Sequence, residues 1–114
     1  MGSPCEVHLA YGPGQSIYVY QHSDGYEEDY VNKVAAAIAY ARPNWGDAGY
    51  FTRMFIDHFI DDHDSSSGFG ITPYPTDSMV KRITVMAETQ CVGRGTGLVL
   101  HFSEFVQNPG LLQL

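Results

Sequence analysis

Hydrophobic and polar positions alternate near the start of the chain, and this alternation predicts a β-hairpin. Residues 6–11 alternate weakly, whereas residues 16–21 place Ile and Val on one side of an extended chain and Tyr on the other. Residues 12–15 (GPGQ) separate the two runs and predict a turn, because Gly and Pro interrupt regular structure.

The next segment repeats its hydrophobic side chains at helical spacing. Residues 27–42 begin with three acidic side chains, which favour the positive end of a helix, and Pro43 stops the pattern. The hydrophobic positions of this predicted helix are Val31, Val34, Ala35, Ile38 and Ala41.

A second amphipathic helix is predicted after a short loop. Asp47 is its candidate N-cap, and Asp57 falls on the face opposite the hydrophobic stripe. The stripe consists of Phe51, Phe55, Ile56, Phe59 and Ile60.

The remainder of the chain predicts strands joined by turns. Residues 69–72 are a short strand, and residues 81–87 alternate as a longer one. Residues 98–102, extended by Val106, are expected to pair with residues 81–87 in a second hairpin.

The predicted order of elements is ββααβββ, in which the helices are consecutive. This order favours an α+β fold with an antiparallel sheet of about five strands and both helices packed on one face. With 114 residues, the chain is expected to be a single domain, residues 1–114. Its apolar tail, residues 111–114, is expected to dock on this domain or on a partner.

Composition and charge narrow the classes of function. The formal net charge is −7, with only six Lys and Arg, which argues against binding to nucleic acid or to an anionic membrane. No targeting segment or membrane-spanning run is evident, so a cytoplasmic location is expected. Cys5 and Cys91 are therefore interpreted as free thiols in a reducing compartment.

One candidate catalytic group lies between the hairpin and the first helix. His22, Asp24 and Tyr26 could form a base with an orienting carboxylate at a strand end. The favoured interpretation is structural, because Asp24 followed by Gly25 also suits a helix cap.

A second candidate is an acidic and histidine-rich run at the end of the second helix. His58, Asp61, Asp62 and His63 could bind a divalent metal, since residues four apart share one side of a helix. The spacing matches neither a zincin helix nor an EF-hand, and charged runs usually face solvent. A solvated surface is therefore favoured, and no cofactor is implied.

Part of the chain resembles a known group of small proteins. Residues 17–26 (IYVYQHSDGY), 55–60 (FIDHFI) and 68–72 (GFGIT) are similar to uncharacterised phage and mobile-element proteins with a Tyr-x-His-x-Asp-Gly-Tyr signature. Some integron gene-cassette proteins are similar in size and style. This chain carries Glu27 where the group usually has Pro. The resemblance implies an origin and no activity.

Three functional hypotheses follow. The first is a small binding or interaction protein that acts as a homodimer or with another protein, because Tyr and Phe are abundant and no catalytic constellation is complete. The second is a small metal-assisted hydrolase that uses the His and Asp groups above. The third is a small-molecule pocket between the sheet and the helices.

Overall fold

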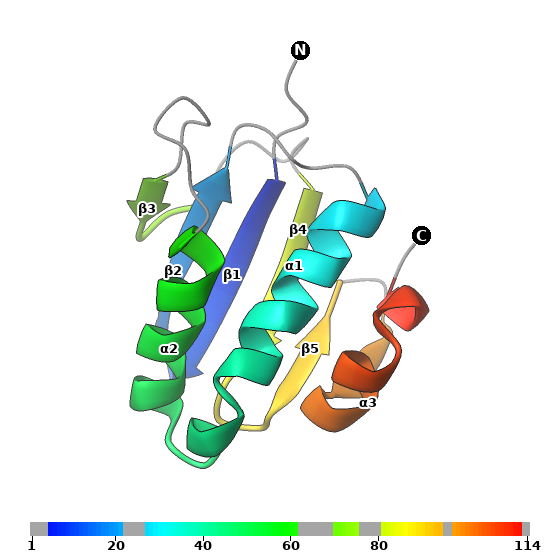
Figure 1. Ribbon diagram of the computed structural model, residues 1–114. Coiled ribbons are helices and arrows are strands. Elements are labelled where there is room, and N and C mark those ends of the chain that lie inside the picture. Colours follow the sequence, from blue (N-terminus) through cyan, green and yellow to red (C-terminus); the bar gives the residue numbers. More distant parts are fainter. Residues whose placement is uncertain (1–4, 22–26, 62–69, 76–80, 95–96, 113–114) are drawn as a thin grey trace.

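The protein is an α+β domain in which three helices lie on one face of a six-stranded sheet (Figure 1). The computed structural model describes residues 5–21, 27–61, 70–75, 81–94 and 97–112. The strands are β1 (Cys5–Gly12), β2 (Gln15–Gln21), β3 (Gly70–Thr72), β4 (Lys81–Met86), β5 (Cys91–Gly93) and β6 (Val99–His101). The helices are α1 (Glu27–Tyr40), α2 (Ala48–Asp61) and α3 (Phe102–Gln107), with short 3-10 helices η1 (Arg42–Asn44) and η3 (Pro109–Leu112).

The sheet is mixed, which corrects the prediction of a purely antiparallel sheet. Its strand order is β3-β2-β1-β4-β5-β6, and β1 runs parallel to β4, whereas every other neighbouring pair is antiparallel. A tight turn forces the two strands of a hairpin to be antiparallel, but β4 follows β1 only after β2, two α-helices and β3. A connection of that length permits either direction.

The second predicted hairpin is also wrong in its pairing. β4 pairs with β5, and β5 pairs with β6, so residues 98–102 do not pair directly with residues 81–87. The short strand β5 has only three residues, too few to show an alternating pattern.

Val106 does not extend a strand, because it lies in α3. This helix begins with a capping box. The His101 side chain accepts a hydrogen bond from the backbone N–H of Ser103, and the Glu104 carboxylate accepts one from the backbone N–H of His101. A capping box satisfies two backbone donors at once and so stabilises a helix start at this point.

The predicted N-cap of α2 is confirmed, since Asp47 accepts a hydrogen bond from the backbone N–H of Tyr50.

The hydrophobic core lies between the helices and the sheet. Phe51, Phe55 and Phe59 of α2 are at most 1% exposed, and the ring of Phe51 stacks on Phe102 of α3 at 4.9 Å. The two predicted helical stripes therefore share one β-layer, as the periodicity indicated.

The C-terminal tail docks on its own domain as far as the structure describes it. Leu112 of η3 is 2% exposed and belongs to the core, whereas its neighbour Leu111 is 49% exposed. No helix in the described ranges is long and apolar enough to cross a membrane.

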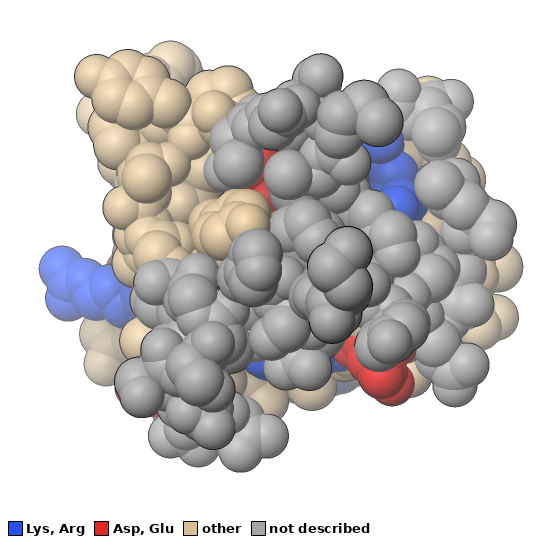
Figure 2. Space-filling view, turned by 90° about the horizontal axis from the view of Figure 1, so that it is seen from above, with Lys and Arg blue, Asp and Glu red and all other residues tan. Residues whose placement is uncertain are grey.

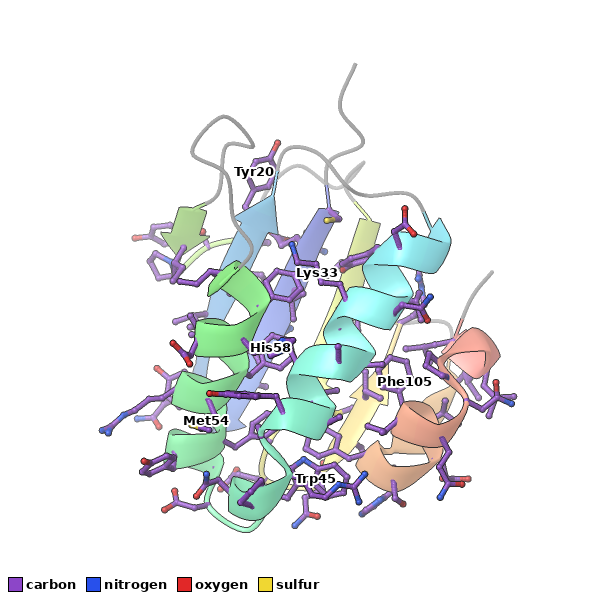
Figure 3. The ribbon with its side chains drawn as sticks, viewed as in Figure 1. Tyr20, Lys33, Trp45, Met54, His58 and Phe105 are labelled. Carbon is purple, nitrogen blue, oxygen red and sulfur yellow. The ribbon has the colours of Figure 1, made fainter. Side chains whose placement is uncertain are left out.

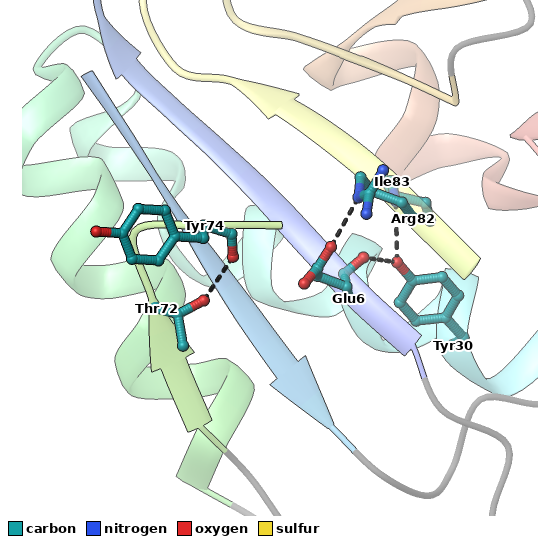
Figure 4. A network of polar contacts seen from close by, with 6 residues as sticks. All are labelled: Glu6, Tyr30, Thr72, Tyr74, Arg82 and Ile83. Atoms are coloured by element: carbon teal, nitrogen blue, oxygen red, sulfur yellow. Dashed lines mark hydrogen bonds and ion pairs between the residues drawn. The ribbon is translucent and has the colours of Figure 1, made fainter. Parts of the chain in front are cut away.

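Tyr30 of α1 reaches from the helix layer into the sheet and bridges β1 and β4. Its hydroxyl donates a hydrogen bond to the carbonyl of Glu6 and accepts one from the backbone N–H of Ile83 at 3.0 Å (Figure 4). The Tyr30 side chain is 0% exposed. The hydroxyl thus satisfies two buried backbone groups at the junction of the two parallel strands.

Replacing Tyr30 by Phe is expected to lower the free energy of unfolding by about 1–3 kcal/mol, because buried backbone groups lose a hydrogen-bond partner. Urea denaturation checks this value, and hydrogen exchange of the Ile83 amide is expected to accelerate. Tyr40→Phe is the matched control on the same helix, since the hydroxyl of Tyr40 donates to the exposed Asp57. Equal effects of the two substitutions would contradict the bridging role of Tyr30.

Candidate functional site

The sheet surface that faces away from α1, α2 and α3, called here the outer face, is the candidate site. Side chains alternate between the two faces of a strand, so the pairing register assigns each residue to a face. The register aligns the outward side chains in three rows across the strands. The ion-pair row contains Tyr20, Glu6 and Arg82, the histidine row Tyr18, His8, Thr84, Gly93 and Val99, and the methionine row Ser16, Ala10, Met86, Cys91 and His101.

The ion-pair row holds the charges of the outer face. Arg82 Nε donates to Glu6 Oε1 at 2.7 Å, and the side chain of Glu6 is 0% exposed whereas that of Arg82 is 31% exposed (Figure 4). After β3 the chain turns across β2 on this face, where Tyr74 lies above the strand (Figure 4). The buried carboxylate of Glu6 needs a charged partner such as Arg82, because an isolated buried charge is strongly destabilising.

Viewed from the end of the molecule at which β1 and β4 begin, the described acidic and basic side chains lie in small separate groups (Figure 2). Within the three described rows of the outer face, Glu6 and Arg82 carry the formal charges, and their pairing cancels them.

His8 lies in the middle of the outer face. Its ring stacks on the ring of Tyr18, with centroids 4.4 Å apart and planes 7° from parallel. Its Nε2 atom is buried and has no hydrogen-bond partner in the described part of the chain. Burial lowers the pKa of His8, the positive charge of Arg82 lowers it further, and the negative charge of Glu6 acts in the opposite direction.

The lower part of the outer face is uncharged and half-exposed. Met86 and Cys91 are partly accessible, Val99 is 53% exposed and the adjacent Leu98 is 44% exposed. Val99 lies on β6, the strand at one edge of the sheet. Apolar and polarizable side chains therefore face outward on three consecutive strands.

The residues predicted as catalytic are not part of the described structure. His22, Asp24 and Tyr26 lie outside the described ranges, and so do Asp62 and His63 of the predicted metal site. Asp61 is the last residue of α2. For these residues the sequence-based hypotheses remain predictions.

His58 is the predicted metal ligand whose surroundings the structure defines. It lies on the side of α2 near α1 (Figure 3), where its ring centroid is 4.9 Å from that of Tyr40. Its Nδ1 atom is buried without a hydrogen-bond partner among the described residues. The neighbouring Asp57 is exposed, as its position opposite the hydrophobic stripe predicted, and accepts a hydrogen bond from the Tyr40 hydroxyl at 3.2 Å.

The described residues do not form a metal site. Within the described ranges, no group of three His, Cys, Asp or Glu side chains is placed to hold a metal ion. The structure instead joins His58 to α1 through an aromatic contact, which stabilises the packing of the two helices.

Cys5 and Cys91 are not joined by a disulfide, as expected. Cys5 is buried on the face of β1 that contacts the helices, whereas Cys91 lies on the outer face. Two cysteines on opposite faces of one sheet cannot form a disulfide without rearrangement of the strands.

Sequence reasoning did not single out Glu6, His8 or Arg82. A signal is present in the run Glu6–Val7–His8–Leu9, in which ionisable side chains alternate with buried hydrophobic ones. Arg82 belongs to a similar alternation 76 residues further along the chain. The alternation alone could not indicate that the two runs are neighbours in one sheet.

No family model matches this chain, and no curated protein or solved structure matches it either. The function is therefore argued from the outer face alone.

Proposed function

We propose that the chain is a binding protein that acts as a homodimer, and that two copies meet through the outer faces of their sheets. The observation that carries this proposal is the charge balance of the three described rows, in which Glu6 pairs with Arg82 and the other two rows carry no Asp, Glu, Lys or Arg, in a chain whose formal net charge is −7. In this proposal the protein is a partner-binding module rather than an enzyme.

Charge favours a second copy at this surface. In a two-fold dimer the same patch meets itself, so any net charge on the patch repels its own copy. The chain has 13 Asp and Glu against six Lys and Arg, and most of its surface therefore resists self-association. On the outer face the pairing of Glu6 with Arg82 cancels the charge, and the histidine and methionine rows contain no Asp, Glu, Lys or Arg.

The chemistry of the side chains supports the same surface. Tyr and Met are enriched at protein interfaces, where Tyr supplies contact area and Met adapts to an irregular partner. Tyr18, Met86 and Val99 project from three different strands of the outer face. An exposed patch of this composition on a small domain commonly marks an interaction site.

Val99→Glu is expected to weaken self-association at least about tenfold, because it places two like charges in the proposed interface without changing the core. Analytical ultracentrifugation across a range of protein concentrations measures the effect. Leu111→Glu is the matched control, because Leu111 has a similar exposure of 49% and lies in η3, outside the outer face.

The two variants carry the same added charge, so a general effect of charge would appear in both. Equal dissociation constants for the two variants would contradict an interface on the outer face. Wild-type protein that stays monomeric at the highest concentration would contradict the homodimer itself.

A further inference from the structure

We propose that His8 makes self-association depend on pH, so that the homodimer forms at neutral pH and separates in mildly acidic solution. This inference rests on the homodimer proposed above, and it adds a means of regulation at the same surface. The geometry around His8, described next, is its main support.

His8 occupies the centre of the proposed interface. It lies on β1, an interior strand flanked by β2 and β4, and in the row between the ion pair and the uncharged lower part of the face. A partner that covers the outer face must therefore cover His8. The side chain is only partly exposed before any partner binds.

The surroundings of His8 favour the neutral imidazole. Among the described residues, the charged and titratable groups that act on it are Tyr18 of β2, whose ring stacks on it, Arg82 of β4 and Glu6 of β1. The positive Arg82 lies in the neighbouring row, and the buried Nε2 of His8 lacks an acceptor among the described residues. An added proton would thus create a second positive charge with poor solvation.

Linkage fixes the direction of the effect. The pKa of His8 is lowered from the ordinary value of 6.5, mainly by burial. A second copy would remove more water from the ring and lower this pKa again, so the dimer would bind fewer protons than two monomers. Association is then independent of this group above the pKa of His8 in the monomer, which lies below 6.5, and weakens as the pH falls through that pKa. Two His8 side chains per dimer limit the change to about 100-fold in the dissociation constant per pH unit.

Ultracentrifugation between about pH 7.5 and about pH 5.5, at constant ionic strength, tests the inference. The dissociation constant of the wild type is expected to rise at least about tenfold over this interval, while circular dichroism confirms that the chain stays folded. His8→Gln cannot be protonated and is expected to show a constant affinity. His58→Gln is the matched control, because His58 also has a buried ring nitrogen but lies on α2.

His101 is the other described histidine on the outer face, and it is exposed at the edge strand β6. A response that disappears in His101→Gln and persists in His8→Gln would overturn the assignment to His8. A stable dimer whose affinity does not change with pH would overturn the regulation and leave the homodimer standing. A wild type that is monomeric at every pH would overturn both.

A measurement without variants gives an independent answer. The titration of the His8 ring protons by NMR, at one concentration that favours monomer and one that favours dimer, reports the pKa in each state. The midpoint is expected to be lower in the dimer. Identical midpoints would contradict the inference, since His8 would then not sense the partner.

Discussion

Replacing Phe55 by alanine is expected to lower the free energy of unfolding by about 3–5 kcal/mol. Phe55 is 0% exposed, and its ring lies 6.0 Å from that of Phe51 and 5.5 Å from that of Phe59. Removal of the ring loses buried apolar area and leaves a cavity between the helix layer and the sheet. Since the free energy of unfolding of small domains is about 5–15 kcal/mol, this substitution would remove a large part of it.

Urea denaturation followed by circular dichroism measures this loss, at a protein concentration low enough that self-association does not contribute. Tyr50→Ala on the same helix is the matched control, because Tyr50 is 48% exposed, and a change within about 0.5 kcal/mol is expected. Phe55→Leu is expected to cost clearly less than Phe55→Ala. A loss below about 1 kcal/mol for Phe55→Ala would mean that the aromatic stripe of α2 is not the centre of the core.

Replacing Arg82 by Met is expected to destabilise the protein by about 2–4 kcal/mol. The substitution leaves the carboxylate of Glu6, whose side chain is 0% exposed, without the guanidinium that lies 2.7 Å away. Loss of one partner from a fully buried ion pair costs about 3–5 kcal/mol, and the 31% exposure of Arg82 reduces this value. Urea denaturation at about pH 7 measures the change.

A double-mutant cycle separates the ion pair from other losses. Glu6→Gln removes the buried negative charge with little change of shape, so adding it to Arg82→Met is expected to restore part of the lost stability. The coupling free energy between the two sites is expected to exceed about 1 kcal/mol. Strictly additive effects would show that the pair contributes through packing rather than through charge.

Local periodicity was sufficient to predict the hairpin and the two long helices. The turn 12–15 limits β1 and β2 to antiparallel pairing, and the recurrence of hydrophobic residues at Phe55, Ile56 and Phe59 fits a helix rather than a strand. These features depend on residues that are near neighbours in the chain. Backbone sterics and the spacing of one hydrophobic stripe make them predictable locally, whereas their stability comes from packing on the sheet.

Two of the errors concern contacts between distant segments, and the third concerns a short helix. The direction of β4 beside β1, the insertion of β5 between β4 and β6, and the helical form of residues 102–107 were not predicted. A three-residue strand has no readable period. The capping box of α3 also depends on His101. This residue ends strand β6, and its position there gives no indication that a helix begins at the next residue.

The candidate site shows the same difference between local patterns, which the sequence reveals, and contacts between distant residues, which it does not. The sequence indicated surplus aromatic residues, an apolar tail and no complete catalytic constellation, and from these the hypothesis of a self-associating binding protein, which remains a proposal. It did not indicate where the binding surface lies. Glu6 and Arg82 are 76 positions apart, and only the parallel register of β1 and β4 makes them partners.

The sequence by itself determined the first hairpin, the two long helices and the hydrophobic side chains of each, because these properties repeat within a few residues. The tertiary structure alone decided the strand order, the burial of Glu6 against Arg82 and the central position of His8 on the outer face. The physical reason is that strand pairing joins residues through hydrogen bonds across long loops. The free energy of that pairing depends on the whole set of packed elements rather than on any local pattern.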